Sequence, residues 1–345
     1  MNIKFRMTAA CIVSLGIIAF TASAGAKNIS IADTVIILLH NVFPAALVEK
    51  FYRHISAANA VIVWDLRFPR ALLAFLAGGS MSVAGAVLQS LLKNQLASPY
   101  MLGVSAGASF GAALVILVGI STPLLGIWML PCAGFAGGLL TVCIVTVFSA
   151  KIDKSFSNNT VILCGMVFSL FINAVITVLM ALRAQKLRTL IMWQMGSFAF
   201  KGWVYVRIMF VFLIIGALPL ARYTRELDLL TFGEIEAKSA GVDTNRVKAL
   251  LFLLATALAG SAVALSGIIG FVDLVGPHLA RRIVGPVHAR LLPASFLAGG
   301  SLMAASDFLA RTVISPSELP VGAVTALIGA PFFAYIYFRP QRRRG

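Results

Sequence analysis

The sequence predicts an all-α polytopic membrane protein with about ten transmembrane helices. Of its 345 residues, 60% are hydrophobic and only 12% are charged, whereas a soluble domain carries about 25% charged residues. The apolar residues are gathered into runs of about 20, which is the length that an α-helix needs to cross a bilayer. A soluble core of this size does not need so much apolar surface, so we expect much of it to face lipid.

Ten runs are candidate spans. They are Met7–Ala26, Phe68–Leu92, Met101–Ile120, Leu124–Ala150, Thr160–Leu182, Trp203–Ala221, Val247–Leu265, Ile268–Ile283, Leu291–Arg311 and Val321–Phe338. The eighth run is short and contains Asp273 and the sequence Gly276-Pro277-His278. Because proline interrupts helical hydrogen bonding, we expect a broken helix there, with its bend at these last three residues.

The first run has two possible fates. Lys4 and Arg6 precede it, and Ala22-Ser23-Ala24 fits the cleavage pattern of a signal peptide. The run is also long enough to span a membrane. We favour a retained first helix, and cleavage would leave the topology of the later spans unchanged.

The basic residues predict the orientation in the membrane. A net charge of +16 would suggest nucleic acid for a soluble protein, but here the charges stand between apolar spans and no aromatic and basic face is available for stacking on bases. Cytoplasmic loops are enriched in Lys and Arg. A cytoplasmic amino terminus followed by ten spans places the majority of these residues, with the tail Arg342–Arg344, on that side. We therefore expect a multi-pass protein of the cell inner (plasma) membrane with both termini cytoplasmic, and no nucleic-acid partner.

A single transmembrane domain over residues 1–345 is expected. Within it, residues 1–66 hold the first helix and an outer segment, and residues 67–345 form the core. We expect part of segment 27–67 to be an amphipathic helix on the outer surface. The inner loop 222–246 balances basic and acidic residues and is long enough for one or two short helices that another protein could grip.

No catalytic chemistry is visible in the sequence. It lacks the phosphate-binding pattern GxxxxGK[ST] and the metal pattern HExxH, so we expect no catalytic residue, no metal site and no cofactor in this chain. Ionisable residues inside spans mark ion or proton pathways, and the candidates are Asp273 and Asp307. Asp307 precedes Arg311 by four residues, which predicts an ion pair along one helix. An ion- or proton-coupled secondary transporter is therefore the alternative class of function.

Two further patterns concern the helices themselves. The hexapeptide Phe75–Ser80 recurs at Phe296–Ser301; an inverted repeat of the helices would not align these copies, so we interpret the match as mainly compositional. Arg67, Arg70 and Arg311 stand at the outer ends of spans, against the positive-inside trend. Arginine binds carboxylates in a bidentate fork, so these residues predict docking of a partner with acidic patches.

A series of motifs follows in order from the second span to the carboxyl end. They are Arg67–Arg70, Gln89, Lys93–Ala108, Met192–Phe198, Gly233–Gly241, Gly267–His278, Glu318–Gly322 and Gly329–Phe332. Together they resemble the FecCD permease family, which supplies the membrane subunits of ABC importers for ferric siderophores, haem and cobalamin. The resemblance implies a type II ABC importer permease-like bundle that transports its substrate by alternating access and is not itself an enzyme.

The resemblance also implies partners and site residues. The expected partners are a second permease copy or a paralogue in a dimer, two copies of a cytoplasmic ABC ATPase that uses ATP and Mg, a periplasmic or lipoprotein substrate-binding protein, and membrane lipid. The implied sites are binding-protein docking at Arg67, Arg70 and Arg311, ATPase coupling at Gly233, Glu234, Glu236, Ala237 and Gly241, and an inner gate at Asn158 and Asn159.

The substrate stays open at this stage. Iron transport by uptake of a ferric siderophore is the first expectation, with haem, cobalamin or another metal complex as alternatives. Two positions depart from the family pattern. Gln95 stands where the family commonly has proline, and Asp273 stands where the family has a small or apolar residue. Two roles are open for the Asp273 carboxylate: it could tune coupling, or it could pair with Arg281 or Arg282.

Overall fold

The computed structural model describes residues 3–25, 27–43, 49–52, 54–119, 126–153 and 157–338, and within them it contains helices and no β-strand. The long helices are α1 (Ile3–Ser23), α5 (Phe68–Leu91), α7 (Met129–Ile152), α8 (Asn158–Leu182), α10 (Trp203–Arg222), α13 (Thr244–Ser266), α15 (His288–Thr312) and α16 (Val321–Phe338). The shorter ones are α2 (Ile31–Val42), α3 (Glu49–Tyr52), α4 (Ala57–Val61), α6 (Val104–Ala113), α9 (Leu187–Gln194), α11 (Thr224–Phe232), α12 (Glu234–Ser239) and α14 (Val272–Val284). Single π or 3-10 turns are η2 (Ile62–Arg67), η3 (Pro99–Leu102), η4 (Leu114–Val118), η5 (Gly126–Trp128) and η6 (Ala184–Lys186).

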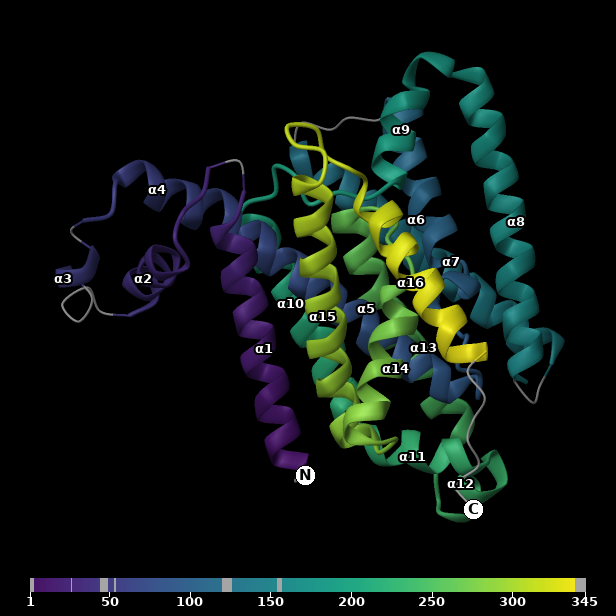
Figure 1. Ribbon diagram of the computed structural model, residues 1–345. Coiled ribbons are helices and arrows are strands. Elements are labelled where there is room, and N and C mark those ends of the chain that lie inside the picture. Colours follow the sequence, from purple (N-terminus) through teal and green to yellow (C-terminus); the bar gives the residue numbers. More distant parts are fainter. Residues whose placement is uncertain are drawn as a thin grey trace.

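The long helices stand side by side as a bundle with two distinct ends (Figure 1). Helices α11 and α12 cover one end, which we call the α11–α12 end. The opposite end carries the loop between α15 and α16, and we call it the arginine end because Arg67, Arg70 and Arg311 gather there. Helix α1 lies along one edge of the bundle and α8 along another (Figure 1).

Length and composition confirm most of the predicted spans. In the described residues, seven helical stretches are long and apolar enough to cross a membrane. They are Ile3–Ser23, Ala57–Leu91, Gly126–Ile152, Asn158–Leu182, Trp203–Arg222, Thr244–Ser266 and His288–Thr312. The other three predicted runs lie on shorter helices, namely α6 with its continuation η4, α14 and α16. The tail Arg342–Arg344 lies outside the described residues.

Helix α5 forms the centre of the core. It is buried along nearly its whole length and packs against α13, α14 and α15. Small residues allow this close approach, as expected where helix association depends on packing. A Cβ atom at Gly85 would collide with the backbone of Asp273 in α14, and one at Gly276 would collide with the side chain of Ser82.

The two copies of the repeated hexapeptide pack against each other. The rings of Phe75 in α5 and Phe296 in α15 meet edge to face, with centroids 5.5 Å apart. The contact is reciprocal, because a Cβ at Gly300 would strike the ring of Phe75 and one at Gly79 would strike the ring of Phe296. A compositional interpretation of the repeat is therefore incomplete: each copy supplies a phenyl ring that fills the space above a glycine of the other.

The predicted helix break is present, but its position differs from the prediction. Helix α14 is continuous through Gly276, Pro277 and His278, and the interruption lies earlier, at the non-helical segment Gly267–Phe271. This segment connects α13 to α14, and its polar backbone is used: Ile269 O accepts from the Tyr100 hydroxyl at 2.6 Å.

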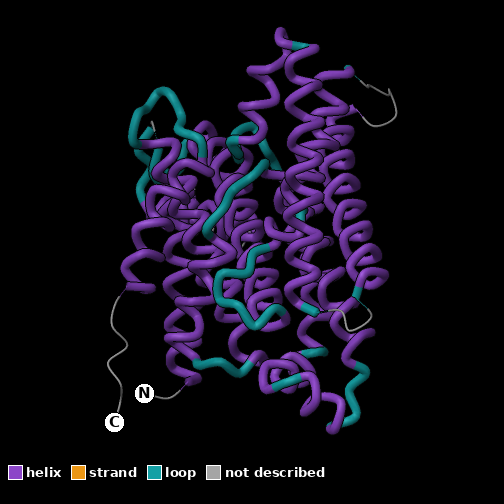
Figure 2. The backbone as a smooth tube through the Cα atoms, turned by 90° about the vertical axis from the view of Figure 1, so that its right-hand side faces the viewer, coloured by secondary structure: helices purple, strands orange, loops and turns teal. Residues whose placement is uncertain are grey.

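Non-helical segments also lie within the depth of the bundle, where loops pass between helices (Figure 2). Such backbone is tolerated at membrane depth only where protein satisfies its hydrogen bonds. The amide of Ser197 donates to Ser266 O at 2.8 Å, and that of Val321 donates to Gly196 O at 3.2 Å. The segments around residues 196, 267 and 321 therefore support one another.

The predicted amphipathic helix in the outer segment corresponds to α2. Ile31, Val35 and Leu39 are exposed along one stripe, while Thr34 and Ile37 are buried. Ser30 caps the helix by accepting from the amide of Asp33 at 3.0 Å. Helices α2 to α4 lie beside α1, outside the main bundle (Figure 1).

Candidate functional site

The three predicted docking arginines come together at one end of the bundle. Arg67 ends η2, Arg70 lies in the first turn of α5, and Arg311 lies in the last turn of α15. All three line a single cavity of about 630 Å³, together with Lys201 and Glu318. The structure therefore forms one basic depression from arginines that are up to 244 positions apart in the chain.

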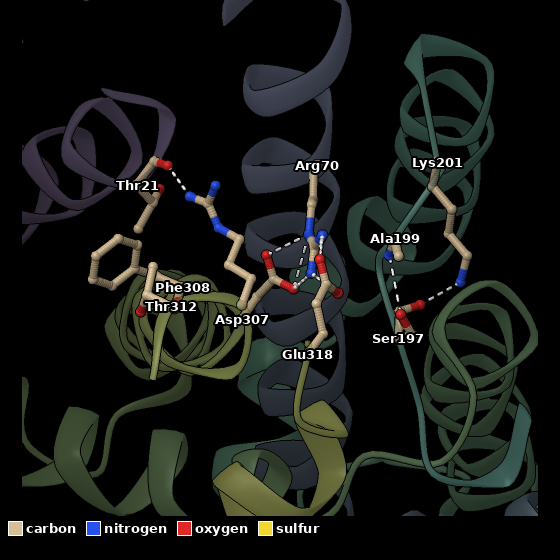
Figure 3. A network of polar contacts seen from close by, with 10 residues as sticks. Thr21, Arg70, Ser197, Ala199, Lys201, Asp307, Phe308, Thr312 and Glu318 are labelled. Carbon is tan, nitrogen blue, oxygen red and sulfur yellow. Dashed lines mark hydrogen bonds and ion pairs between the residues drawn. The ribbon is translucent and has the colours of Figure 1, made fainter. Parts of the chain in front are cut away.

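Arg70 is held between two carboxylates (Figure 3). Its Nη2 donates to Asp307 Oδ1 at 2.8 Å and its Nε donates to Oδ2 at 2.9 Å. Its Nη1 donates to Glu318 Oε1 at 2.7 Å. The predicted pair between Asp307 and Arg311 is wrong: Asp307 turns toward α5 because Arg70 offers it a bidentate fork, which a neighbour one turn away on the same helix does not match.

The other two arginines bind the end of α1. Arg67 donates to the carbonyls of Ser23 and Lys27, the latter at 2.6 Å. Arg311 donates to the carbonyl of Thr21. The last carbonyls of a helix lack partners within the helix and carry partial negative charge. The two guanidinium groups thus satisfy the carboxyl end of α1, and they anchor this helix to α5 and α15.

Two further ionisable groups outside the spans are perturbed at the arginine end. The hydrogen bond from Arg70 lowers the pKa of Glu318 below its usual range. Burial lowers the pKa of Lys201 to about 8. The Lys201 ammonium donates to the carbonyl of Ser197 at 2.5 Å (Figure 3). It also donates to the carbonyl of Leu265, so this lysine satisfies a carbonyl at the carboxyl end of α13.

At the α11–α12 end, the predicted coupling residues form a compact helical corner. Gly233 separates α11 from α12, and Gly241, with φ of +83°, takes a left-handed conformation that favours glycine. Glu234 and Glu236 lie in the first turn of α12, where acidic residues are favourable. Ala237 is fully buried, so it fixes α12 against the core.

Two residues of this corner were not singled out from the sequence. Phe232 is 80% exposed and Ile235 is 78% exposed, on either side of the turn at Gly233. Their neighbours Leu227 and Leu230 are buried in the same cluster as α5 and α13. The corner therefore anchors one apolar face in the bundle and presents another outward, beyond the bundle end. The sequence signal was an apolar residue on each side of the glycine within a charged loop.

Polar contacts tie the corner to three transmembrane helices. The Lys248 ammonium of α13 lies 2.6 Å from Glu234 of α12. His288, at the start of α15, lies 2.6 Å from Asp228 of α11 through Nδ1 and 2.6 Å from the hydroxyl of Ser90 in α5 through Nε2. Because Lys248 and His288 are buried, these contacts join the corner firmly to the bundle.

The predicted gate residues lie in the first turn of α8. Asn158 is partly buried and Asn159 is exposed. The turn is supported by Asp153, whose carboxylate accepts from the amide of Ser157 and the hydroxyl of Thr160, both at 3.2 Å. The two asparagines therefore begin α8, at the end of this helix that is nearer to α11 and α12 (Figure 1).

Of the two roles left open for Asp273, the pairing with Arg281 or Arg282 is wrong. Asp273 is buried in the first turn of α14 and accepts from the hydroxyl of Ser98. Arg281 instead donates to Gln89 Oε1 at 2.5 Å. The reason is direction: Asp273 begins α14 and the arginines end it, so the helix carries them to opposite ends.

Comparison with known proteins shows which proteins this chain resembles in sequence. The FecCD transport family model matches residues 8–339. A Bacillus subtilis ABC transporter permease, YvrB, is 42% identical over 281 residues, covering 81% of this chain and 80% of that protein. The haemin transport permease HmuU of Yersinia pestis is 35% identical, with coverage of 82% and 85%.

A solved structure supports the same assignment. A transporter described as of the metal-chelate ABC type, captured in an inward-facing conformation, superposes with a TM-score of 0.83 at 30% identity and covers 96% of this chain and 98% of that one. The match of fold and sequence extends over both the arginine end and the α11–α12 corner. The chain belongs to the FecCD transport family.

Proposed function

We propose that this protein is the membrane-spanning permease subunit of an ATP-driven ABC importer, and that it carries a metal chelate across the cell inner membrane by alternating access. The observation that carries the proposal is the α11–α12 corner. It is anchored in the bundle by buried Leu227 and Leu230, and it presents exposed Phe232 and Ile235. This arrangement suits a segment that an ATPase subunit binds on its exposed face and that transmits the motion of this subunit to the transmembrane helices.

The proposed orientation puts the α11–α12 end in the cytoplasm and the arginine end outside. The distribution of Lys and Arg along the sequence favours this direction. Two copies of an ABC ATPase, which binds ATP and Mg, would then meet Phe232 and Ile235 from below. A substrate-binding protein would approach the arginine end.

Docking of that binding protein is assigned to the basic depression. Arg67, Arg70 and Arg311 line it, and carboxylates on a partner are the natural match for guanidinium groups. Arg70 already holds Asp307 and Glu318. A docking carboxylate must therefore compete with Glu318, which is the more exposed of the two, and this makes the contact reversible.

A second permease copy or a paralogue is proposed to complete the pathway. Helix α8 is long and apolar, yet only 22% of its most apolar window is buried within the chain. Leu163, Val167 and Leu170 are exposed along it. Packing of this face on a partner permease would bring the Asn158 and Asn159 pairs of the two copies toward a shared gate at the cytoplasmic side.

The substrate is proposed to be a ferric-siderophore-type iron chelate, with haem, cobalamin or another metal complex as the alternatives. The relatives transport different cargoes, since HmuU is a haemin permease and BtuC of Halobacterium salinarum, 37% identical, is a cobalamin permease. The secondary-transporter alternative is disfavoured because Asp307 is committed to Arg70, leaving Asp273 as its remaining buried carboxylate.

Reconstitution in proteoliposomes tests the proposal. The protein, its ATPase and its binding protein are incorporated, and uptake of radiolabelled ferric siderophore, haem and cobalamin is measured with and without ATP. We expect uptake of one cargo class, strictly dependent on ATP and on the binding protein. Uptake that follows an ion gradient without ATP would contradict the importer and make Asp273 the residue to test.

A further inference from the structure

A groove separates the amino-terminal half of α1 from α14 and α15. Its volume is about 730 Å³, within the range of about 300–1,000 Å³ that is usual for ligand pockets. Its walls are apolar, with Val13 and Ile17 on one side and Leu297 and Ala298 on the other. Helix α1, which forms one wall, lies along an edge of the bundle (Figure 1).

The serine hydroxyls that line the groove are hydrogen-bonded within the protein. The hydroxyls of Ser14 in α1 and Ser301 in α15 bond each other at 2.9 Å, and the Ser14 hydroxyl also contacts Ala10 O at 2.8 Å. These contacts connect the two walls while leaving the surface of the groove apolar. Its lining suits a hydrocarbon chain.

The mouth of the groove at the α11–α12 end is basic. Arg6 of α1 and Arg282 of α14 both line it. Arg6 donates through one nitrogen to Ile283 O at 2.6 Å, which holds its guanidinium against the carboxyl end of α14. Arg282 is exposed. Two cationic side chains therefore line the same groove, one from each wall.

The combination of an apolar trough and a cationic mouth is complementary to a lipid with an acyl chain and an anionic head group. Basic pockets between transmembrane helices bind the head groups of anionic lipids, and arginine is suited to phosphate because it donates in a fork. A purely apolar transmembrane helix of another protein would bring a hydrophobic surface to the trough but no anionic group to match the two arginines. Charge complementarity thus selects the occupant.

We propose that the groove between α1 and α14–α15 binds one anionic phospholipid of the leaflet at the α11–α12 end. An acyl chain lies along Val13, Ile17, Leu297 and Ala298, and the phosphate contacts Arg6 and Arg282. The lipid fills the space between α1 and the bundle, so it stabilises the position of α1. This site is separate from docking and coupling, and it does not depend on the proposed function.

Native mass spectrometry of the full-length protein, titrated with phosphatidylglycerol or phosphatidylcholine, tests the head-group contact. We expect the wild type to prefer phosphatidylglycerol. Arg282→Gln combined with Arg6→Gln should weaken phosphatidylglycerol binding about 30-fold, since each basic residue near an anionic surface contributes about 1 kcal/mol. Arg290→Gln is the matched control, because Arg290 is exposed at the same end and does not line the groove. An unchanged preference in the double variant would overturn the proposal.

A second variant tests the trough independently. Ala298→Trp fills it, and should reduce the binding of both lipids while thermal unfolding in detergent stays near the wild-type value. Arg282→Gln alone removes no contact within the protein that the structure records, so it remains informative if the double variant folds poorly; it should cost about fivefold. Equal binding of phosphatidylglycerol to wild type, Ala298→Trp and Arg282→Gln would show that the lipid does not occupy the groove.

Discussion

The Nδ1 atom of His288 lies 2.6 Å from the carboxylate of Asp228, and this contact joins the first turn of α15 to α11. The same imidazole reaches Ser90 of α5 through Nε2. One buried side chain thus connects the proposed ATPase-facing corner to the two helices whose repeated glycine motifs form the centre of the bundle.

We expect Asp228→Asn to separate transport from ATP hydrolysis. The substitution keeps the shape of the side chain but removes its charge, so motion of the corner would pass less completely to α15. ATP-driven uptake in proteoliposomes should fall about tenfold, equivalent to ~1.4 kcal/mol, while ATPase activity is retained. Arg246→Gln, in an exposed pair with Asp243, is the control, and an equal effect of both variants would argue against a specific link.

Glu234→Gln should destabilise the protein. The buried Lys248 ammonium lies 2.6 Å from this carboxylate, and hydrogen bonds to charged groups contribute about 1.5–3 kcal/mol. Thermal unfolding in detergent measures the loss. Glu236→Gln, on the same short helix, should cost little, since no ion pair of Glu236 is recorded among the described residues. Equal melting temperatures for Glu234→Gln and wild type would refute the contribution of this pair.

Arg70→Gln and Glu318→Gln should change docking in opposite directions. Loss of Arg70 removes a guanidinium from the basic depression and should weaken binding of the substrate-binding protein. Loss of the Glu318 charge removes the carboxylate that competes with the binding protein for Arg70, so it should strengthen binding. The effect should be clearest at low salt, where exposed charges are least screened. Surface plasmon resonance with the protein in nanodiscs measures both affinities; changes of the same sign would contradict the competition.

Glu318 should also make stability depend on pH. Its pKa is lowered in the folded state by the hydrogen bond from Arg70. At a pH between this lowered pKa and the ordinary one, Glu318 therefore binds more protons in the unfolded chain than in the folded protein. The stabilisation is therefore complete above the ordinary value of 4.5 and is lost as pH falls through the lowered one. The gap in melting temperature between wild type and Glu318→Gln should be smaller at about pH 4 than at pH 7. A gap that is the same at both pH values would show that ionisation of Glu318 does not contribute to the stability of the fold.

Gly300→Ala tests the reciprocal packing of α5 and α15. A Cβ there would collide with the ring and the carbonyl of Phe75, and overpacking of this kind costs about 1–3 kcal/mol. Gly16→Ala in α1 is the matched control, because nothing lies within 4 Å of the added carbon. The first variant should unfold at a lower temperature and the second should not, and equal behaviour would mean that the interface relaxes freely.

Much of the fold could be predicted from the sequence, because the length of a hydrophobic run and the charges that flank it are local features of the chain. Each predicted span has most of its described residues in helices, and the three arginines predicted for docking line one cavity although they come from different segments. The partners of Asp307 and Asp273 were predicted wrongly for one reason. Spacing along a helix identifies neighbours on that helix, whereas Arg70 and Ser98 reach these carboxylates from other elements through packing.

The bend in the eighth run failed for a related reason. Proline marks a missing hydrogen-bond donor, but Pro277 lies inside α14, while the actual break at Gly267–Phe271 is held open by contacts from Tyr100. The exposed Phe232 and Ile235 were missed because their role depends on which face of the corner is buried. Those facts belong to tertiary packing, and a single sequence does not contain them directly.

Affinity purification of the tagged protein in mild detergent, with mass spectrometry of its companions, tests the central claim most directly. The account predicts stoichiometric recovery of an ABC ATPase, and its loss from the double variant Phe232→Asp with Ile235→Asp, which charges the exposed face of the corner, while the permease itself is still recovered. A protein that is purified intact without an ATPase, and that transports in liposomes without ATP, would contradict the assignment as an importer permease.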